Sequence, residues 1–341
     1  MKKNKFLKFL GWFLGILLCM GMVGYIAVTN NPQLVVGIIQ KGIYKEANPN
    51  SFEPLNGAYK GLKANGQYLI SEIRYSEEYP NSYLDIIYPD NNTEVDRPTL
   101  FYFHGGGFFG GSKNMGDPLA ESEATYLIDD IVAKGYNVVN VDYALVPDYH
   151  FPTPLVQMNQ AIAYIKQHAE EYNLNVNNVV LMGSSAGGIM TSQYGSILTN
   201  EHYASLLGIV PSIEKDKVKA LVIDDAPLDY KNFPLGTKML VGNYVSGSIY
   251  LSDDEIKKYN NIYHITSEYP ATFLLGSEYR KDMLTLHEAL EKVDVENELV
   301  DPLVEYGIEK PHGFVANLRN DEISMEAFHR FIDFINNETK K

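Results

Sequence analysis

The chain has 341 residues, with 43 acidic against 28 basic side chains and a formal net charge of −15 at neutral pH. This length allows one large domain with a substantial buried core, plus an accessory segment. The acidic balance argues against nucleic acid or an anionic surface as the partner of the main domain. Because Cys19 is the single cysteine, the chain can build neither an internal disulfide nor a cysteine-based zinc site.

The first 31 residues differ in composition from the rest of the chain. Four lysines within the first eight residues precede an uncharged, mostly apolar run from Phe9 to Val28. A helix of about 20 residues spans a bilayer, and a basic flank is expected to stay on the cytoplasmic side. We therefore expect residues 1–31 to form a transmembrane signal-anchor that places the main domain outside the cytoplasm at the cell membrane. A cleaved signal peptide, which would release a secreted protein, and a buried hydrophobic helix are the alternatives.

Residues 32–65 form a mixed apolar and polar segment that links the N-terminal run to the main domain, predicted at 66–341. Within the linker, residues 33–43 favour a helix. The main domain begins with two stretches of alternating polarity that are rich in Tyr and Ile, at 66–75 and 82–88. These are predicted to be antiparallel strands at one edge of a sheet.

From Arg97 onward, apolar strands alternate with helices. Strands are predicted at 99–103, 137–142, 178–182, 220–224 and 272–275, with a last one within 298–306. Helices are predicted at about 118–134, 153–172, 186–198, 280–293 and 322–337. This order predicts an α/β fold with a mostly parallel sheet that is covered by helices on both faces.

One long segment interrupts this alternation, at about residues 226–269. It is rich in Tyr, Asn and Gly, and Ser252 followed by Glu255 predicts a capping box at the start of a short helix. An insertion between two core strands at this place is predicted to form a lid or a wall of a pocket. An ordinary long surface excursion is the alternative.

The most informative stretch runs from Val179 to Gly188. An apolar run rich in β-branched residues leads into Gly-Ser-Ser-Ala-Gly at 183–187, which fits G-x-S-x-G with Ser185 at the centre and Ser184 at the variable position. The pattern predicts a strand that stops, turns sharply and starts a helix, with a serine at the apex of the turn. Small residues also fill ordinary tight turns, so this motif alone has low specificity.

Two further motifs raise that specificity. His-Gly-Gly-Gly at 104–107 follows the predicted strand 99–103, and Pro-His-Gly-Phe at 311–314 lies near the C-terminus. With these motifs the chain resembles the α/β-hydrolase fold, and specifically the hormone-sensitive-lipase-like branch of serine esterases, whose marks are HGGG and G-x-S-A-G-G. The resemblance runs from about Ser71 to the C-terminus.

The resemblance implies a serine hydrolase that cleaves a small carboxylic ester through an acyl-enzyme. Ser185 would be the nucleophile and His312 its general base. The backbone N–H groups of Gly106, Gly107 and Ala186 would surround the developing oxyanion. The sequence contains no metal-ligand spacing, no P-loop and no dinucleotide fingerprint, so we expect neither a metal nor a cofactor. Nothing in it indicates the oligomeric state.

The third member of the catalytic set departs from the family pattern. There, a strand ends in Gly or Ala, and an Asp follows after two residues; here Tyr279 or Arg280 occupies that place. The family also carries a second acid four positions after the first, and Glu278 and Asp282 reproduce that spacing. We therefore predict Glu278 as the acid that orients His312, with Asp282 as the alternative.

Two other functions stay open at this point. A serine peptidase of the same fold would use the same residues. A non-catalytic, hydrolase-shaped binding module on the cell surface would account for the departure at the acid. Reaction of Ser185 with a fluorophosphonate separates enzyme from binding module, and comparison of ester with aminopeptide substrates separates the two enzymes.

Overall fold

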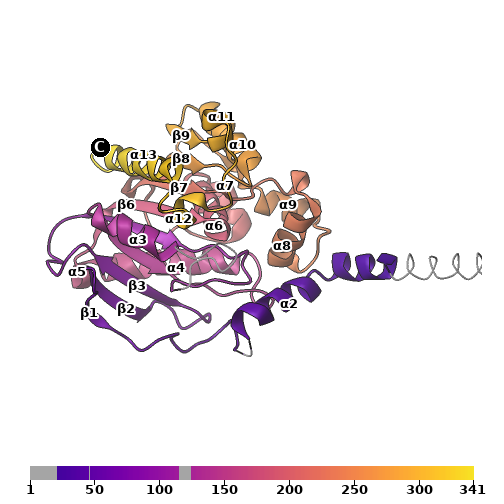
Figure 1. Ribbon diagram of the computed structural model, residues 1–341, viewed down its shortest axis with the longest axis horizontal. Coiled ribbons are helices and arrows are strands. Elements are labelled where there is room, and N and C mark those ends of the chain that lie inside the picture. The colour runs from indigo at the N-terminus through magenta and orange to yellow at the C-terminus, as the bar shows by residue number, and fades with distance from the viewer. Residues whose placement is uncertain (1–20, 46, 115–123) are drawn as a thin grey trace, which may run out of the picture.

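The computed structural model describes residues 21–45, 47–114 and 124–341. Nine strands form one sheet: β1 (Lys60–Leu62), β2 (Tyr68–Arg74), β3 (Tyr83–Tyr88), β4 (Pro98–Phe103), β5 (Asn137–Val141), β6 (Asn175–Ser184), β7 (Val218–Asp224), β8 (Ala271–Leu275) and β9 (Asn297–Val300). Their spatial order is β1-β2-β3-β5-β4-β6-β7-β8-β9 (Figure 1). Strands β4 to β9 run parallel, and β1, β2 and β3 add an antiparallel edge. The predicted mostly parallel sheet with an antiparallel edge is confirmed.

The described helices from residue 33 onward are α2 (Gln33–Tyr44), α3 (Ala124–Ala133), α4 (Thr153–Gln167), α5 (Ala169–Tyr172), α6 (Ala186–Thr199), α7 (Glu201–Leu207), α8 (Leu235–Ser246), α9 (Asp253–Tyr259), α10 (Arg280–Glu291), α11 (Pro302–Tyr306), α12 (Phe314–Asn317) and α13 (Glu322–Glu338). The predicted helices are found, with the one at 153–172 divided into two, but α7, α8, α11 and α12 were not predicted. There are also three described 3₁₀ turns, η1 (Lys215–Lys217), η2 (Tyr230–Asn232) and η3 (Asn261–His264), and a further described helix, Gly21–Asn30, precedes α2. The predicted helix at 118–134 is described only from Ala124 onward, and its first six positions lie outside the described residues.

The last strand, predicted within 298–306, is β9 at Asn297–Val300, one residue earlier at its start. The side chain of Asp301 accepts hydrogen bonds from the backbone N–H groups of Leu303 and Val304, at 3.1 and 3.3 Å. This N-cap ends the strand and starts α11, because it satisfies amide donors that a helix start leaves without partners.

The sheet is buried on both faces because side chains of a strand point alternately to opposite sides. On β4, Leu100 and Tyr102 pack in the core under α3, α12 and α13. Phe101 and Phe103 pack in the core on the other face, under α4, α6 and α10. This two-sided burial explains why the central strands read as continuous apolar runs.

The predicted insertion between β7 and β8 contains η2, α8, α9 and η3, and lies beside the sheet in Figure 1. The predicted capping box at α9 is confirmed. The Ser252 hydroxyl accepts from the Glu255 N–H at 3.3 Å, and the Glu255 carboxylate accepts from the Ser252 N–H at 2.7 Å. The sequence did not predict α8, because its apolar residues are not concentrated on one face of the helix and show little helical periodicity.

At the N-terminal end, helix Gly21–Asn30 extends away from the domain and meets α2 at an angle of 77° (Figure 1). In the described part of the chain, neither of these helices alone is long and apolar enough to cross a bilayer, although the bent pair together has the necessary length and composition. The first 20 residues of the predicted anchor at 1–31 lie outside the described residues. The predicted helix at 33–43 is confirmed as α2, and the Gln40 side chain ties it to the domain by donating to the carbonyls of Phe109 and Val146, both at 2.9 Å.

Candidate active site

The predicted sharp turn lies between β6 and α6, with Ser185 at its apex. Ser185 has φ of 53° and ψ of −114°, a backbone conformation that residues other than glycine rarely adopt. Its N–H donates to the carbonyl of Asp224 on the neighbouring strand at 2.8 Å, and its carbonyl accepts the first bond of α6 from Ile189 at 3.0 Å. The strand–turn–helix arrangement that the motif predicts is present.

The glycines of the motif are required by close backbone approaches. A Cβ atom on Gly183 would lie 2.1 Å from the carbonyl oxygen of Gly187. A Cβ atom on Gly187 would lie 2.0 Å from the carbonyl oxygen of Phe103, at the end of β4. Because any side chain would collide with backbone at either position, the turn can close only with glycine there.

The neighbouring serine has a different environment. Ser184 is buried, and its hydroxyl donates to the Asp224 carboxylate at 2.9 Å. Ser185, one residue further on, is only half-buried. The geometry therefore favours Ser185 over Ser184 as the exposed hydroxyl of the turn.

His312 lies in the loop that precedes α12, followed by Gly313 in a left-handed conformation with φ of 63°. Its Nδ1 atom is 2.5 Å from Oδ2 of Asp225, the residue that directly follows β7. The ring of Tyr279 packs edge-on against the imidazole at 5.4 Å between ring centres. The imidazole is 19% exposed, whereas the Asp225 carboxylate is fully buried.

The Asp225 carboxylate is held by the loop that follows β8. Oδ1 accepts from the backbone N–H groups of Ser277 and Tyr279, both at 2.8 Å. Oδ2 accepts from the Glu278 N–H at 3.0 Å and from the Ser277 hydroxyl at 2.5 Å. These four hydrogen bonds fix the orientation of the buried carboxylate.

The structure corrects the predicted acid. The carboxylate in contact with the imidazole of His312 is that of Asp225, where Glu278 or Asp282 was predicted. The Glu278 side chain is exposed, whereas the backbone N–H of Glu278 donates a hydrogen bond to the Asp225 carboxylate. Oδ1 of Asp282 accepts from the N–H groups of Leu228 and Asp229, at 2.9 and 2.8 Å, and so caps the loop after β7.

The sequence did contain a signal for Asp225. It is an acidic residue directly after a buried strand, between Ser185 and His312 in chain order. Because β7 and β8 are adjacent and parallel, the loops after both strands reach the same edge of the sheet. The family pattern directed attention to the second loop, and spacing along the chain cannot distinguish between two loops that meet in space.

The predicted oxyanion loop, residues 104–107, follows β4 and passes beside the start of α6. Gly106 and Gly107 have φ of 105° and 59°, and a Cβ atom on Gly106 would lie 2.2 Å from the carbonyl oxygen of Gly110. Ala186 is the first residue of α6, where an N–H has no carbonyl one helical turn earlier to bind. The structure thus places the elements that carry these three predicted donors next to one another.

His104 supports this loop. Its ring stacks on Tyr143 at 4.2 Å between centres, and its Nδ1 lies 2.7 Å from the carbonyl of Gly105. Burial lowers the pKa of His104 to about 4, so the imidazole is neutral at pH 7.

Asp142, directly after β5, is buried behind the loop with its Oδ1 3.6 Å from Nε2 of His104. Burial raises the pKa of Asp142 to about 7. The ammonium and backbone N–H of Lys113 oppose this shift, while the carboxylates of Asp85 and Glu72 add to it. Asp142 therefore titrates near neutral pH inside the domain.

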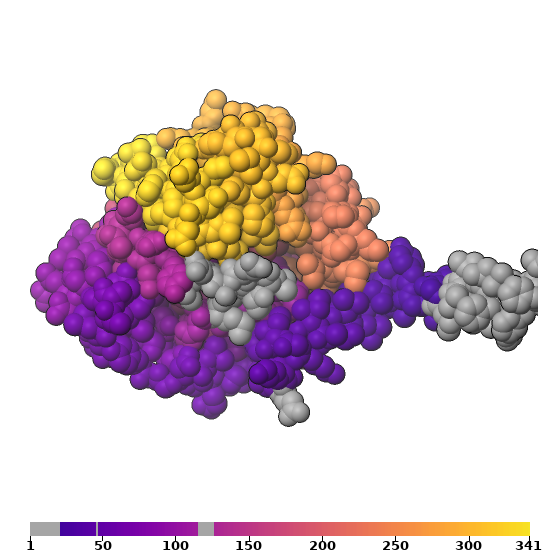
Figure 2. Space-filling model, in the orientation of Figure 1, coloured from indigo at the N-terminus to yellow at the C-terminus, as the bar shows by residue number. Residues whose placement is uncertain are grey.

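A cleft of about 1160 Å³ opens beside His312. It is bounded by the start of the insertion, the loop after β8 and the loop before α12. Its lining residues are Asn232, Phe233, Pro234, Thr237, Gly276, Ser277, Glu278, Tyr279, Arg280, Lys281, Asp282, Asp301, Pro302, Leu303, Glu309, Lys310, Pro311, His312, Asn317 and Leu318. Figure 2 shows the outer surface of the insertion and of the C-terminal region that contribute to this cleft.

Residues 84–285, more than half of the chain, match the BD-FAE family. The chain belongs to the BD-FAE family. The BD-FAE match runs from the second residue of β3 past β8 and includes Ser185 and Asp225, but ends before His312. Acetyl esterases of Salmonella paratyphi B and Salmonella typhi are 32% and 33% identical to the chain over 108 residues, 32% of this chain and 31% of each relative. The chain thus matches about a third of the length of these curated relatives.

Solved structures show the same fold over nearly the whole chain. Esterase B from Lactobacillus rhamnosis has a TM-score of 0.66 at 16% identity and covers 94% of this chain and 96% of that one. A fungal esterase from Rhizomucor miehei has a TM-score of 0.63 at 20% identity, over 82% of this chain and 86% of that one. The predicted α/β-hydrolase fold, and the relationship to hormone-sensitive-lipase-like esterases, are confirmed.

Replacement of Asp225 by Asn is expected to lower kcat for an ester substrate by about 10³- to 10⁴-fold. The amide would no longer fix the tautomer of His312 or stabilise its imidazolium form. Steady-state kinetics on purified protein measure the effect, and KM is expected to change little.

Glu278→Gln and Asp282→Asn serve as matched controls for that variant. Each variant removes one carboxylate from the same cleft and leaves the contact between His312 and Asp225 in place. The kcat of each should therefore stay within about threefold of wild type. A large loss in Glu278→Gln, with Asp225→Asn still active, would reverse the assignment of the acid.

The pKa of Asp142 predicts a pH-dependent contribution to stability. The folded-state pKa, about 7, lies above the unfolded value of about 3.9, so between these values the folded state binds more protons and the free energy of unfolding falls as pH rises. Asp142→Asn removes this slope. The stability of wild type relative to the variant should fall by about 3 kcal/mol between pH 5 and pH 8 in urea titrations. A difference that does not change with pH would contradict the assigned titration.

Proposed function

We propose that this protein hydrolyses carboxylic esters, with Ser185 as nucleophile, His312 as general base and Asp225 as the orienting acid. The observation that carries the proposal is the 2.5 Å contact between Nδ1 of His312 and the buried carboxylate of Asp225. This contact lies at the carboxyl edge of the same sheet that presents Ser185 on a strained turn. A serine, a histidine and a buried acid in this order along the chain form the arrangement that activates a hydroxyl for acyl transfer.

The contact determines which nitrogen of the imidazole acts as base. With Nδ1–H donating to Asp225, Nε2 is the nitrogen whose lone pair can accept a proton. In the first half-reaction Nε2 of His312 removes the proton of the Ser185 hydroxyl while Oγ forms a bond to the ester carbonyl carbon. The Asp225 carboxylate stabilises the imidazolium that results.

The negative charge on the former carbonyl oxygen is expected to bind the N–H groups of Gly106, Gly107 and Ala186. Each such donor typically lowers the barrier by about 3 kcal/mol. The bond between the former carbonyl carbon and the alkoxide oxygen then breaks, and His312 donates its proton to that oxygen. The alcohol leaves, and the acyl group stays bound to Oγ of Ser185 as the acyl-enzyme. A water that loses its proton to Nε2 attacks the acyl carbon, and collapse of the second intermediate returns the proton to Ser185 and releases the acid.

An ester substrate is favoured over an amide by two observations. The matched curated relatives are named acetyl esterases, and the chain carries both HGGG and G-x-S-A-G-G. A serine peptidase of the same fold is the alternative that a substrate comparison must exclude. The argument for a non-catalytic binding module was that the sequence has no acid at the position where the family pattern places one. The carboxylate of Asp225 next to His312 removes that argument.

Ser185→Ala should lower kcat for p-nitrophenyl acetate by at least about 10⁴-fold, because the acyl-enzyme can no longer form. Ser184→Ala is the matched control: it removes a hydroxyl that binds Asp224, so most of the activity should remain. Equal losses in the two variants would mean that the register of the turn is misassigned. Faster cleavage of an aminopeptide p-nitroanilide than of the ester would favour the peptidase.

We also propose that the chain is anchored in the cell membrane with its main domain outside the cytoplasm. The basic start and the uncharged run at residues 9–28 support this location. Apolar side chains also continue along the exposed surface of the following helices, with Met22 64%, Val23 67% and Ile38 72% exposed. Such exposure is unusual on a surface that faces only water.

The full-length protein should sediment with membranes. When the outer layers of the cell are removed and the cell membrane is left intact, added protease should digest the main domain. A variant that lacks residues 1–31 should be recovered from the soluble fraction with its esterase activity intact. Recovery of the full-length protein in the soluble cytosolic fraction would contradict the proposed location.

A further inference from the structure

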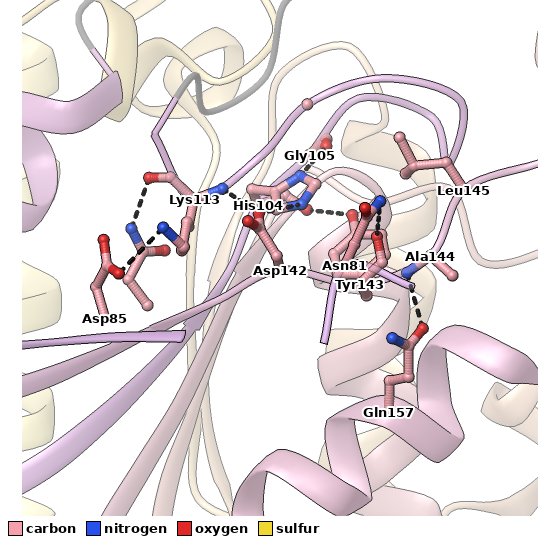
Figure 3. A network of polar contacts seen from close by, with 12 residues as sticks. Asn81, Asp85, His104, Gly105, Lys113, Asp142, Tyr143, Ala144, Leu145 and Gln157 are labelled. Carbon is pink, nitrogen blue, oxygen red and sulfur yellow. Dashed lines mark hydrogen bonds and ion pairs between the residues drawn. The ribbon is translucent and has the colours of Figure 1, made fainter. Parts of the chain in front are cut away.

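A buried ammonium group, that of Lys113, lies six residues beyond the oxyanion loop at 104–107. Nζ of Lys113 is 2.7 Å from Oε1 of Glu72 and 3.0 Å from Oδ1 of Asp85. The Lys113 and Glu72 side chains are 0% and 1% exposed, and that of Asp85 is 7% exposed. Figure 3 shows Lys113 between Asp85 on one side and Asp142 and His104 on the other.

Burying the ammonium of Lys113 costs free energy. Lysine is rarely buried, and a buried lysine needs nearby groups that compensate its charge. Burial alone lowers the pKa of Lys113, but Asp85, Asp142 and Glu72 together raise it above its usual value, so the ammonium stays charged. A loop residue at the end of a glycine-rich segment could point into water at no such cost. Its inward position needs a reason beyond core packing.

The backbone of Lys113 is held as firmly as its side chain. Its N–H donates to the carboxylate of Asp142, and its carbonyl accepts from the side-chain amide of Asn140 at 2.7 Å. Asn140 belongs to β5 and Asp142 follows it, whereas Glu72 and Asp85 belong to β2 and β3. One residue thus joins the chain beyond the oxyanion loop to three strands of the sheet.

The start of the loop is fixed to the same segment. The carbonyl of His104 accepts from the hydroxyl of Tyr143 at 2.7 Å, and the two rings are stacked. Asp142 and Tyr143 are consecutive, so both ends of the loop from His104 to Lys113 are attached at one place (Figure 3). Gly106 and Gly107, whose N–H groups are the expected oxyanion donors, lie between these attachments.

We propose that Lys113 is a positioning residue for catalysis: its ion pairs with Glu72 and Asp85 hold the oxyanion loop so that the N–H groups of Gly106 and Gly107 point at the developing oxyanion. This proposal rests on the proposed esterase function. Oxyanion donors act through preorganisation, and a shift of a fraction of an ångström weakens them mainly in the transition state. Loss of the tether is therefore expected to lower kcat and to leave substrate binding nearly unchanged.

The test uses Lys113→Met, which keeps the length of the side chain and removes its charge. Because this variant leaves two buried carboxylates without a cation, the double variant Glu72→Gln/Lys113→Met accompanies it and removes one charge of each sign. Glu72→Gln alone, which keeps the pair of Lys113 with Asp85, is the mildest change. In the two variants that lack Lys113, kcat for p-nitrophenyl acetate should fall ten- to a hundredfold with KM within twofold of wild type, and Glu72→Gln should give a smaller loss in kcat.

A transition-state analogue separates positioning from general damage. A trifluoromethyl ketone forms a hemiketal with Ser185 whose oxyanion needs the loop donors, whereas the corresponding secondary alcohol binds without them. In each variant the Ki of the ketone should rise by the same factor as kcat/KM falls, and the Ki of the alcohol should stay within twofold.

Arg330→Met is the control for loss of a paired cation elsewhere. Arg330 binds the carboxylates of Glu298 and Glu305 at 2.8 and 2.5 Å near β9, outside the proposed catalytic set. The kcat of the Arg330→Met variant should therefore match that of wild type. Wild-type kcat in the folded double variant, or a parallel rise in KM and in the Ki of the alcohol, would overturn the role of Lys113. Activity retained by Ser185→Ala would instead overturn the esterase mechanism itself, whatever the Lys113 variants show.

Discussion

The approach of Gly187 to the carbonyl of Phe103 is the constraint on which the arrangement of the site depends. It brings the end of β4 against the first turn of α6, with no room for a single extra carbon atom. Since the oxyanion loop begins at His104 and the helix begins one residue after Ser185, this approach places the expected oxyanion donors beside the expected nucleophile. A substitution at Gly187 would therefore disturb both parts of the site together.

The acidic side of the site is divided between two adjacent strand ends. The loop after β7 supplies the carboxylate of Asp225, and the loop after β8 supplies the backbone donors that orient it. Asp282 in turn caps the first loop through the N–H groups of Leu228 and Asp229. Each loop thus stabilises a group of the other, and parallel pairing of β7 with β8 keeps the two in register.

Behind the oxyanion loop the core of the protein contains charged side chains. Glu72, Asp85, Lys113 and Asp142 are buried together, with more carboxylates than ammonium groups to balance them. Proton uptake by Asp142 near neutral pH relieves part of this imbalance. The cluster lies at the junction of the antiparallel edge with the parallel sheet, where three strands can each contribute one polar group to a single loop.

The sequence by itself determined the alternation of the main strands and helices from Arg97 onward, the turn at Ser185 and the part of the chain that contains His312. These features are local: a strand is marked by a run of apolar residues, and a tight turn by glycines that no other residue can replace. Only the tertiary structure decided which acid meets His312, because Asp225 and Glu278 follow neighbouring strands that end at the same edge of the sheet. It also decided the burial of Lys113, since its partners Glu72 and Asp85 come from strands that precede it in the chain by 41 and 28 positions. Contacts of that kind depend on strand pairing across the sheet, which residue spacing along one chain does not encode.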